Sequence, residues 1–552
     1  MTTLSTEQFS SLPVPQQIAQ LARVDAKTRQ ELLLSARGSL DLVRSLSPEM
    51  LFYTLKEIGM TDAVGLLGLA SPEQVRDMMD LDCWQKDQLN NQRIISWLML
   101  LDEAGSGKLA EWVLHADIEL LVLLVKRHFE VVRQADVEED PDFDRSPYFT
   151  FDDQYLLRFL GEEEPILPLL LERLRVLDYG QYTYVLENSI LELDSGLEEA
   201  ELRWRNARLA DRAYPEYEEA RELFVPVRPE SIPLDRYQRA VRPLRFASGE
   251  ELIPSDHALM LLEPQNSFLL RALAAVPAED LEAISQELAA LTNQVVIADG
   301  CDPGELAEVR RSVALTHDTL NIGLAFFAEG DETRAAHRLR ETVLRPIFQA
   351  GFGLTSRVSQ QARALDADLL KSGLVAWETY LDTPFREGVA GAKRRPPLFF
   401  RGLETTGEIL YRPFQELADI HTVERMLAQL PIWFGVVHQL AAWTPGPALE
   451  GVTLSVLWNT AFVHWVVDKT STCQPVHRKD IAVWQRHVKG KKLEPALAAF
   501  IATVAARCQL TEDDTETLRP LAAFAQERLD DVMAVDATTI DLNYIEGLLV
   551  TE

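Results

Sequence analysis

The sequence is poor in cysteine and lacks any export signal that we can recognise. Its few cysteines are widely separated, with no CxxC pair: Cys83, Cys301, Cys473 and Cys508. A secreted chain of this size would more often carry a disulfide framework, so the sparse pattern favours a reducing compartment. The segment from Met1 to Ala22 has no basic stretch followed by an apolar core, which a signal peptide would need. We therefore expect a cytoplasmic protein.

Motifs that would commit the chain to a reaction are missing as well. The sequence contains no GxGxxG dinucleotide motif, no GxxxxGK[ST] phosphate loop, no HExxH metalloprotease motif and no GxSxG nucleophile motif. Each of these patterns places backbone or side-chain groups where a specific chemistry needs them. Their absence leaves the reaction class open, and we favour a protein without catalytic function.

Positive charge is also scarce relative to negative charge. The chain has 54 lysines and arginines against 86 aspartates and glutamates, a formal net charge of −32. Such a field repels nucleic acids and anionic membranes, whereas it attracts basic protein surfaces and divalent cations. We therefore expect a protein partner and no nucleic acid.

Two long uncharged runs raise the question of membrane insertion. The first extends over 426–449 and the second over 451–467, with Thr444-Pro445-Gly446-Pro447 between the helical patterns. Both runs contain polar groups, such as His438 and Asn459, that hydrocarbon would leave without partners. We expect a buried helical hairpin here and no stable membrane insertion.

The N-terminal part contains a short internal repeat, which we call the N-terminal echo. Leu46-Ser47-Pro48-Glu49 is repeated as Ala70-Ser71-Pro72-Glu73, 24 residues later, and an apolar helical pattern follows each copy. Serine caps a free backbone N–H group, proline suits the first helical position, and glutamate meets the positive end of the helix dipole. Each copy thus predicts a helix start. Units this small must stack on their neighbours to bury an apolar face.

The remaining sequence is also helical in pattern, and its composition is that of an ordinary globular protein. The predicted fold class is all-α, with superhelical helical-hairpin repeats followed by a larger, irregular helical domain. Helix is expected over Asp152–Leu160, and the charge-rich stretch Glu198–Glu222 is expected to be exposed along much of its length.

Breaks in this pattern predict the domain organisation. The acidic run from Asp136 to Asp142 and the proline-rich stretch from Val225 to Ser255 interrupt helical periodicity. The predicted segments are a helical-repeat superhelix (1–135), a second helical segment (146–224), a Pro-rich connector (225–257) and a C-terminal helical domain (258–552).

The N-terminal echo resembles the cytosolic N-terminal domain of MgtE-type magnesium transporters. The residues that carry it are Leu46 to Glu49, Asp62 to Leu67 and Ser71 to Val75, within a likeness over residues 20–130. In that family the domain is a regulatory superhelix that responds to Mg²⁺, but no transport pore is recognisable here. The chain as a whole resembles an uncharacterised bacterial family of unknown function.

A second resemblance lies in the C-terminal half. The run from Leu320 to Phe327, with Ala335, Leu339 and Pro346 after it, is similar in spacing to a single tetratricopeptide hairpin. An ordinary helical hairpin explains one copy equally well.

One group of side chains has the chemistry of a metal site. His464 and Asp468 are four residues apart on a helical pattern, and Cys473 and His477 follow in a loop. Nitrogen, sulfur and oxygen ligands of this kind suit Zn²⁺ or Fe²⁺, although the spacing matches no zinc signature. The alternative is a core histidine and a small buried cysteine.

Two further candidates have simpler explanations. His317-Asp318 and His337 could form an acid–base pair, yet helix capping and a solvated surface account for them. The basic loop at Lys393-Arg394-Arg395 could bind phosphate, but pairing with the chain's own acidic surface is the simpler reading.

These observations favour a cytoplasmic, non-catalytic helical-repeat scaffold or regulatory protein that binds another protein. The alternative is a metal-binding enzyme or sensor centred on His464, Cys473 and His477. The sequence assigns no cofactor beyond that divalent metal, and it does not define the oligomeric state.

Overall fold

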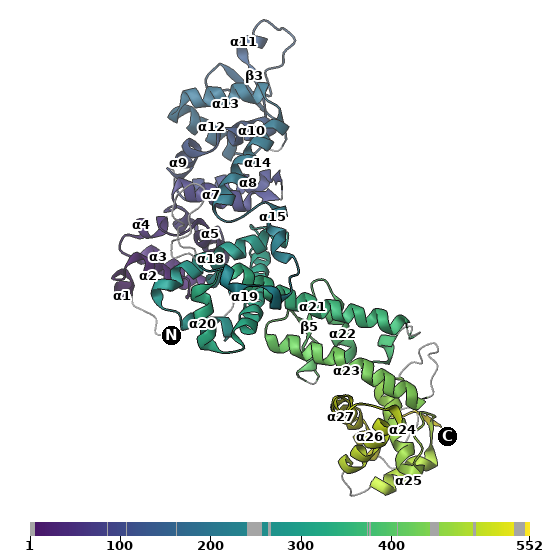
Figure 1. The fold of residues 1–552 in the computed structure, drawn as a ribbon. Helices are drawn as coiled ribbons and strands as arrows, with labels where there is room; N and C mark the ends of the chain where they lie inside the picture. The colour runs from purple at the N-terminus through teal and green to yellow at the C-terminus, as the bar shows by residue number, and fades with distance from the viewer. Residues whose placement is uncertain are drawn as a thin grey trace. The chain divides into compact units, whose positions relative to one another are not determined.

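The computed structural model describes residues 6–551, apart from 86, 106, 162, 240–256, 263–265, 372–373, 375–376, 406, 442–451, 489–492 and 535–546. Within these limits the chain is largely helical, and its strands form short pairs (Figure 1). The all-α fold class is therefore confirmed. The chain divides into two compact units, Met1–Ala350 and Gly351–Glu552. The four segments expected from the sequence stay predictions.

The first unit contains most of the helices. In order they are α1 (Thr6–Ser10), α2 (Val14–Leu21), α3 (Ala26–Ser35), α4 (Ser39–Arg44), α5 (Pro48–Ile58), α6 (Val64–Leu67), α7 (Pro72–Asp82), α8 (Asn91–Glu103), α9 (Lys108–His115), α10 (Ile118–His128), α11 (Gln134–Val137), α12 (Ile166–Leu177), α13 (Tyr179–Leu191), α14 (Asp194–Asp211), α15 (Tyr217–Arg221), α16 (His257–Met260), α17 (Phe268–Ala274), α18 (Ala278–Ala298), α19 (Leu306–Ala328) and α20 (Glu332–Glu341). Its strands are β1 (Trp84–Gln85), β2 (Gln88–Leu89), β3 (Phe129–Arg133) and β4 (Tyr155–Phe159). Short 3₁₀ turns η1 (Glu222–Phe224), η2 (Pro229–Ser231) and η3 (Leu234–Arg236) lie in the described part of the Pro-rich connector and just before it.

Helix α21 (Leu344–Lys371) crosses the boundary between the units. The second unit then contains η4 (Trp377–Tyr380), α22 (Phe385–Lys393), β5 (Phe399–Phe400), η5 (Arg401–Leu403), β6 (Tyr411–Arg412), α23 (Leu417–Ala441), α24 (Leu454–Asp468), β7 (Val476–His477), α25 (Arg478–Val488), α26 (Glu494–Cys508), α27 (Glu512–Glu527), α28 (Leu529–Ala534) and β8 (Val550–Thr551).

Both copies of the N-terminal echo begin helices as the sequence predicts. Ser47 is the N-cap of α5, where its Oγ accepts a hydrogen bond from the Met50 N–H at 3.2 Å. Ser71 caps α7, and Gln74 completes a reciprocal capping box with it at 3.1 and 2.9 Å. The capped helices pack against each other. Local sequence is sufficient to place these helix starts because all the capping groups lie within four residues.

The prediction of a helix over Asp152–Leu160 is wrong, because that segment contains strand β4. It pairs antiparallel with β3, so that Phe129 lies opposite Phe159. The Phe129 and Phe159 rings are 4.7 Å apart, and Phe149 packs 6.0 Å from Phe129. Five apolar-rich residues are too few for periodicity to separate a strand from a helix. Figure 1 shows β3 beside α10 and α13, and the strand contacts both helices.

The stretch Glu198–Glu222 is exposed along much of its length, as expected, but the residues of α14 that face α7 are not. Arg208 makes two hydrogen bonds to the Asp80 carboxylate, at 2.6 and 2.9 Å, and lies 2.8 Å from Asp117. Arg212 pairs with the buried carboxylate of Asp77. Part of the alternating charge in this stretch therefore belongs to a buried ion-pair network, and the rest forms a solvated face.

Glu201 belongs to the same network but has weak pairing. Its Oε1 lies 3.5 Å from Arg208, and its buried Oε2 has no hydrogen-bond partner among the described residues. Burial, and next the negative charge of Asp117, raise the pKa of the Glu201 carboxyl to about 8. This group thus retains its proton in the folded protein at pH values where an unfolded chain would have lost it.

The second unit has its own aromatic core and a carboxylate anchor. Its large buried side chains include Trp377, Trp458 and Trp484. Asp382 accepts hydrogen bonds from the Thr453 hydroxyl at 2.7 Å and from the Ser455 N–H at 3.1 Å, at the start of α24. That carboxylate satisfies donors that the helix start would otherwise leave free.

Helices α23 and α24 pack together, in line with the buried hairpin expected over the two uncharged runs. The expected turn at Thr444-Pro445-Gly446-Pro447 lies outside the described residues. Across the described helices, none combines the length and apolar character that a membrane crossing requires.

We predict that Arg208→Ala destabilises the first unit, because it leaves the buried Asp80 carboxylate without its bidentate partner. The expected loss in the free energy of unfolding is about 3 kcal/mol or more. Urea denaturation followed by circular dichroism would measure it. Arg203→Ala, an exposed change on the same helix, should stay within about 0.5 kcal/mol of the unsubstituted protein. Equal stability of the two variants would contradict a structural role for the Arg208–Asp80 pair.

We predict a pH-dependent contribution from Glu201. Its folded-state pKa is raised above 4.5, so the folded protein binds a proton that the unfolded chain releases. Stability from this group is therefore present at low pH and is lost as the pH rises from about 5 to about 8. Glu201→Gln should remove that loss. At the upper end of this pH range the variant should be more stable than the unsubstituted protein by about 1 to 3 kcal/mol. The exposed change Glu199→Gln is the matched control. If stability depends on pH in the same way in Glu201→Gln and in this control, the prediction is contradicted.

Candidate functional site

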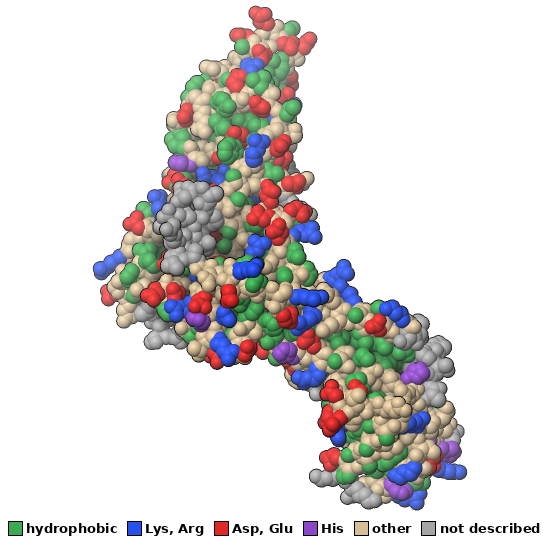
Figure 2. All heavy atoms as spheres, in the orientation of Figure 1, with side chains coloured by type: hydrophobic (Ala, Val, Ile, Leu, Met, Phe, Trp, Pro, Cys, Tyr) green, Lys and Arg blue, Asp and Glu red, His purple; other side chains and the backbone are tan. Residues whose placement is uncertain are grey.

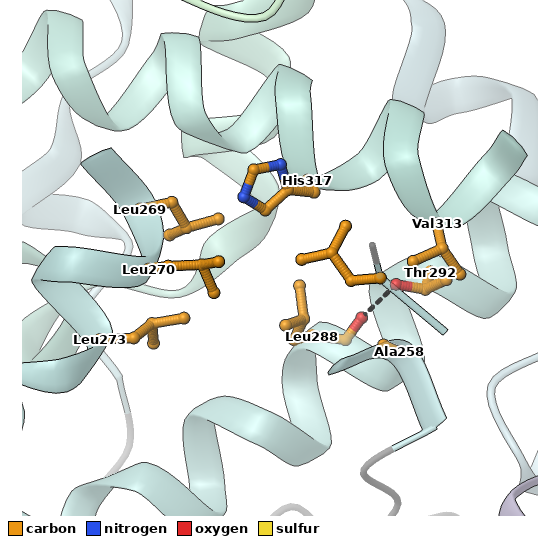
Figure 3. A pocket seen from close by; sticks show the side chains of 9 residues that line it. Ala258, Leu269, Leu270, Leu273, Leu288, Thr292, Val313 and His317 are labelled. Carbon is orange, nitrogen blue, oxygen red and sulfur yellow. Dashed lines mark hydrogen bonds between the residues drawn. The ribbon is translucent and has the colours of Figure 1, made fainter. Parts of the chain in front are cut away.

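A small apolar pocket lies in the first unit, between α16, α17, α18 and α19 (Figure 3). Its cavity volume is only about 10 Å³, which is room for about one water molecule. The lining residues are Ala258, Leu262, Leu269, Leu270, Leu273, Leu288, Thr292, Val313 and His317. Thr292 donates its hydroxyl proton to the Leu288 carbonyl at 2.7 Å. The imidazole of His317 is thus the titratable group in an otherwise apolar lining.

His317 is the centre of a chain of hydrogen bonds. Its Nε2 lies 2.8 Å from the Ser267 Oγ, and its Nδ1 lies 3.0 Å from Asp318 Oδ1. All three side chains are buried. In the neutral tautomer that donates Nδ1–H to the Asp318 carboxylate, Nε2 accepts from the serine hydroxyl.

Two residues of α19 fix the position of α17. Ser267 is the N-cap of α17, and its Oγ accepts from the Leu270 N–H at 3.2 Å. Asn321, one helical turn after His317, accepts from the Leu269 N–H at 2.8 Å through Oδ1. Because residues four apart share one face of a helix, α19 holds the first turn of α17 at two adjacent points.

Capping and surface solvation, the explanation favoured from the sequence for His317 and Asp318, is wrong. Both residues lie in the middle of α19 and are buried. His337 is exposed and lies 3.1 Å from Glu341, as expected for a solvated face, and it does not join them. Ser267 was not a candidate from the sequence, where its only signal is that of a helix cap.

The four residues of the predicted metal site each bond to the protein nearby. His464 Nε2 lies 3.0 Å from the Gln474 carbonyl, and Asp468 accepts from the backbone and hydroxyl of Thr470. His477 Nδ1 accepts from the Lys479 N–H. In the part of the chain that the structure describes, no three His, Cys, Asp or Glu residues are grouped to hold a metal ion. The metal site stays a prediction that the arrangement does not support.

Cys473, the remaining member of that set, is buried beside α24. Its thiol donates to the Leu457 carbonyl at 3.4 Å, and burial raises the pKa of the thiol to about 12. The thiolate is the form that binds metals, so this environment opposes ligation at neutral pH.

The basic segment at Lys393 is paired with nearby acids. Lys393 is the last residue of helix α22, and its Nζ lies 3.1 Å from Asp366 and 2.6 Å from Glu378. Arg394 stacks on the Tyr411 ring at 4.1 Å. Both contacts agree with an intramolecular role for these cations.

A different feature lies on the surface of the first unit. Large apolar side chains are exposed at one helical hairpin, and we call this set the α12–α13 face: Val176, Leu177, Tyr179, Tyr184, Leu191 and Leu193. Val176 is 70% exposed, Leu191 67% and Leu193 75%. Figure 2 shows hydrophobic side chains gathered over this part of the unit. Tyr184 and Leu191 are seven residues apart and so share the outer side of α13.

Acidic residues surround this face in the sequence. Residues 134–199 contain 18 acidic and four basic side chains, a net charge of −14 in a chain of −32. Glu187, on the same side of α13, is neutralised by Arg133 at 2.5 Å and bonds to the Tyr155 hydroxyl at 2.7 Å. The exposed apolar groups therefore sit within a strongly negative region.

The fold and these features define a two-unit, largely α-helical protein. The chain belongs to a family of unknown function (DUF6178), whose model matches residues 6–551. Neither a curated protein nor a solved structure shows significant similarity to it.

We predict that protein purified without added metal contains less than stoichiometric zinc and iron, because the predicted ligands already bond to protein groups. Elemental analysis would measure both metals. A stoichiometric metal that is lost on His464→Ala and Cys473→Ala, but kept on His337→Ala, would contradict this and restore the metal hypothesis.

Proposed function

We propose that this chain is a cytoplasmic scaffold or regulatory protein that binds another protein through the α12–α13 face. The supporting observation is the exposure of six large apolar side chains at one hairpin. Water contact with that much apolar surface is unfavourable, and contiguous exposed patches mark interaction sites. The helical echo at Ser47 and Ser71 supports the accompanying proposal that the N-terminal part is a helical-repeat superhelix, similar to the cytosolic domain of MgtE-type transporters.

The chemistry of the face selects the class of partner. Tyr184 and Leu191 present anchors two helical turns apart, which suits the apolar side of a bound helix. The net charge of −14 in the same region favours cations beside that apolar side. The proposed partner is therefore a basic, amphipathic helical segment of another protein. A polyanion such as nucleic acid would be repelled.

We predict that the full chain binds a fluorescein-labelled amphipathic peptide of leucine and lysine, followed by fluorescence anisotropy. The double change Tyr184→Asp and Leu191→Asp should weaken binding by about tenfold or more, because it removes two apolar anchors. Binding should also weaken at high salt, because screening reduces the charge attraction.

The double variant separates anchoring from bulk charge. It makes the protein more negative, so a peptide held by charge alone would bind it more tightly. Ile409→Asp changes an apolar residue of the second unit that is 83% exposed and should leave the affinity unchanged. Unaltered or tighter binding to the double variant, or equal binding of a leucine–glutamate peptide, would contradict the proposal.

A further inference from the structure

We propose that the second unit binds an acidic segment of another protein through the outer side of helix α25. This goes beyond the proposed function, because it concerns the other unit and a partner of opposite charge. Residues 469–492 carry seven lysines or arginines and one aspartate, a net charge of +6 in a chain of −32. Figure 2 shows Lys, Arg and His side chains over the end of the second unit that holds α25.

Helix α25 is fixed to the second unit by its apolar side, which leaves its cations on the outer side. The helix packs against α24, and its buried residues are Ile481, Trp484 and Val488. Three exposed side chains form what we call the α25 basic face: Lys479, Arg486 and His487. Lys479 and Arg486 are seven residues apart, so they share one side of the helix and are separated by about 10 Å along its axis.

The two permanent cations of this face have no acid of the chain beside them. Among the described residues, neither Lys479 nor Arg486 forms an ion pair. In the same unit, by contrast, Lys393 is paired with two carboxylates. A cation without an internal partner keeps its attraction for an anion that arrives from solution. The α25 basic face is therefore open to an acidic ligand, whereas the segment around Lys393 is not.

Hydrogen bonds within the helix hold two of these side chains and leave their outer groups for a ligand. The Arg486 Nε donates to the Ala482 carbonyl at 3.1 Å, and its Nη groups have no hydrogen-bond partner among the described residues. His487 Nδ1 lies 3.0 Å from the Val483 carbonyl. A guanidinium can bind both oxygens of one carboxylate, and a side chain that is already held loses less entropy on binding.

The size of the face favours a short acidic protein segment over a nucleic acid. Helix α25 has 11 residues and is therefore about 16 Å long. Duplex DNA carries one charge about every 1.7 Å along a much longer rod, so it would extend past this helix toward a chain of net charge −32. Single strands need exposed aromatic rings for base stacking, and Trp484 of α25 is fully buried.

A fluorescein-labelled peptide of glutamate and glycine, followed by fluorescence anisotropy with the full chain, tests the proposal. We expect binding that weakens as salt screens the attraction. The double change Lys479→Glu and Arg486→Glu should weaken it about tenfold or more, because it replaces attraction with repulsion at two points. The milder changes Lys479→Gln and Arg486→Gln should act in the same direction. All four are at exposed positions, and circular dichroism should show native helicity.

A matched control separates this face from bulk charge. Lys371→Glu with Arg386→Glu alters two exposed cations of the same unit that pair with neighbouring acids, and it makes the same change in net charge. It should alter the affinity by no more than about twofold. Equal weakening by the two double variants would overturn the proposal.

Other occupants of the face would give different results. A duplex oligonucleotide or a phosphatidylserine vesicle that binds at least as tightly as the peptide would overturn the choice of an acidic protein segment. Self-association in sedimentation velocity that is lost in the Lys479→Glu, Arg486→Glu variant would instead assign the face to a second copy. No binding of the peptide to the folded full chain would also refute the proposal.

This proposal and the proposed function can fail separately. Tyr184→Asp with Leu191→Asp leaves the α25 basic face intact, so the glutamate–glycine peptide should bind that variant as it binds the unsubstituted protein. Because the α25 basic face would also attract a leucine–glutamate peptide, that control for the α12–α13 face belongs in the Lys479→Glu, Arg486→Glu variant.

Discussion

Buried carboxylates on one short helix set the constraint on which the first unit depends. Three aspartates of α7 are at most about one-twentieth exposed, and ionised groups so placed must be paired. Each takes a cation from another part of the chain: Arg212 pairs with Asp77, Arg208 with Asp80, and Lys56 with Asp82. Helices α5 and α14 consequently cannot move away from α7 without leaving a charge uncompensated in the interior.

The same logic extends to the helices that carry the pocket. Arg93, which also approaches Asp82, reaches Asp302 at 3.0 Å, and Arg310 of α19 pairs with Glu57 of α5 at 2.5 Å. Asn293 of α18 donates to the backbone carbonyl of Arg212 at 2.9 Å. Polar links therefore join the N-terminal helices to α18 and α19. This explains why residues on either side of the Pro-rich connector belong to one compact unit.

What the sequence predicts correctly is local, and what it misses depends on distant partners. The caps at Ser47 and Ser71 were predictable because each serine accepts a hydrogen bond from the N–H group only three residues later. Strand β4 was not, because its identity depends on pairing with β3 across the intervening loop. Ser267 looked like any helix cap, since its histidine partner is 50 residues away. The buried side of α14 was missed for the same reason, because Arg208 meets an aspartate of a helix distant in the sequence.

Charge also decides what the α12–α13 face can bind. An exposed apolar patch would ordinarily favour association with a second copy of itself, because both partners bury surface. Here each copy would bring a segment of net charge −14 against the same segment of the other copy. Repulsion between the two segments would oppose the apolar attraction at moderate salt. The same charge attracts a cationic helix. Acidic residues around exposed apolar groups therefore disfavour the wrong partner, a second copy, while they strengthen the encounter with a basic one.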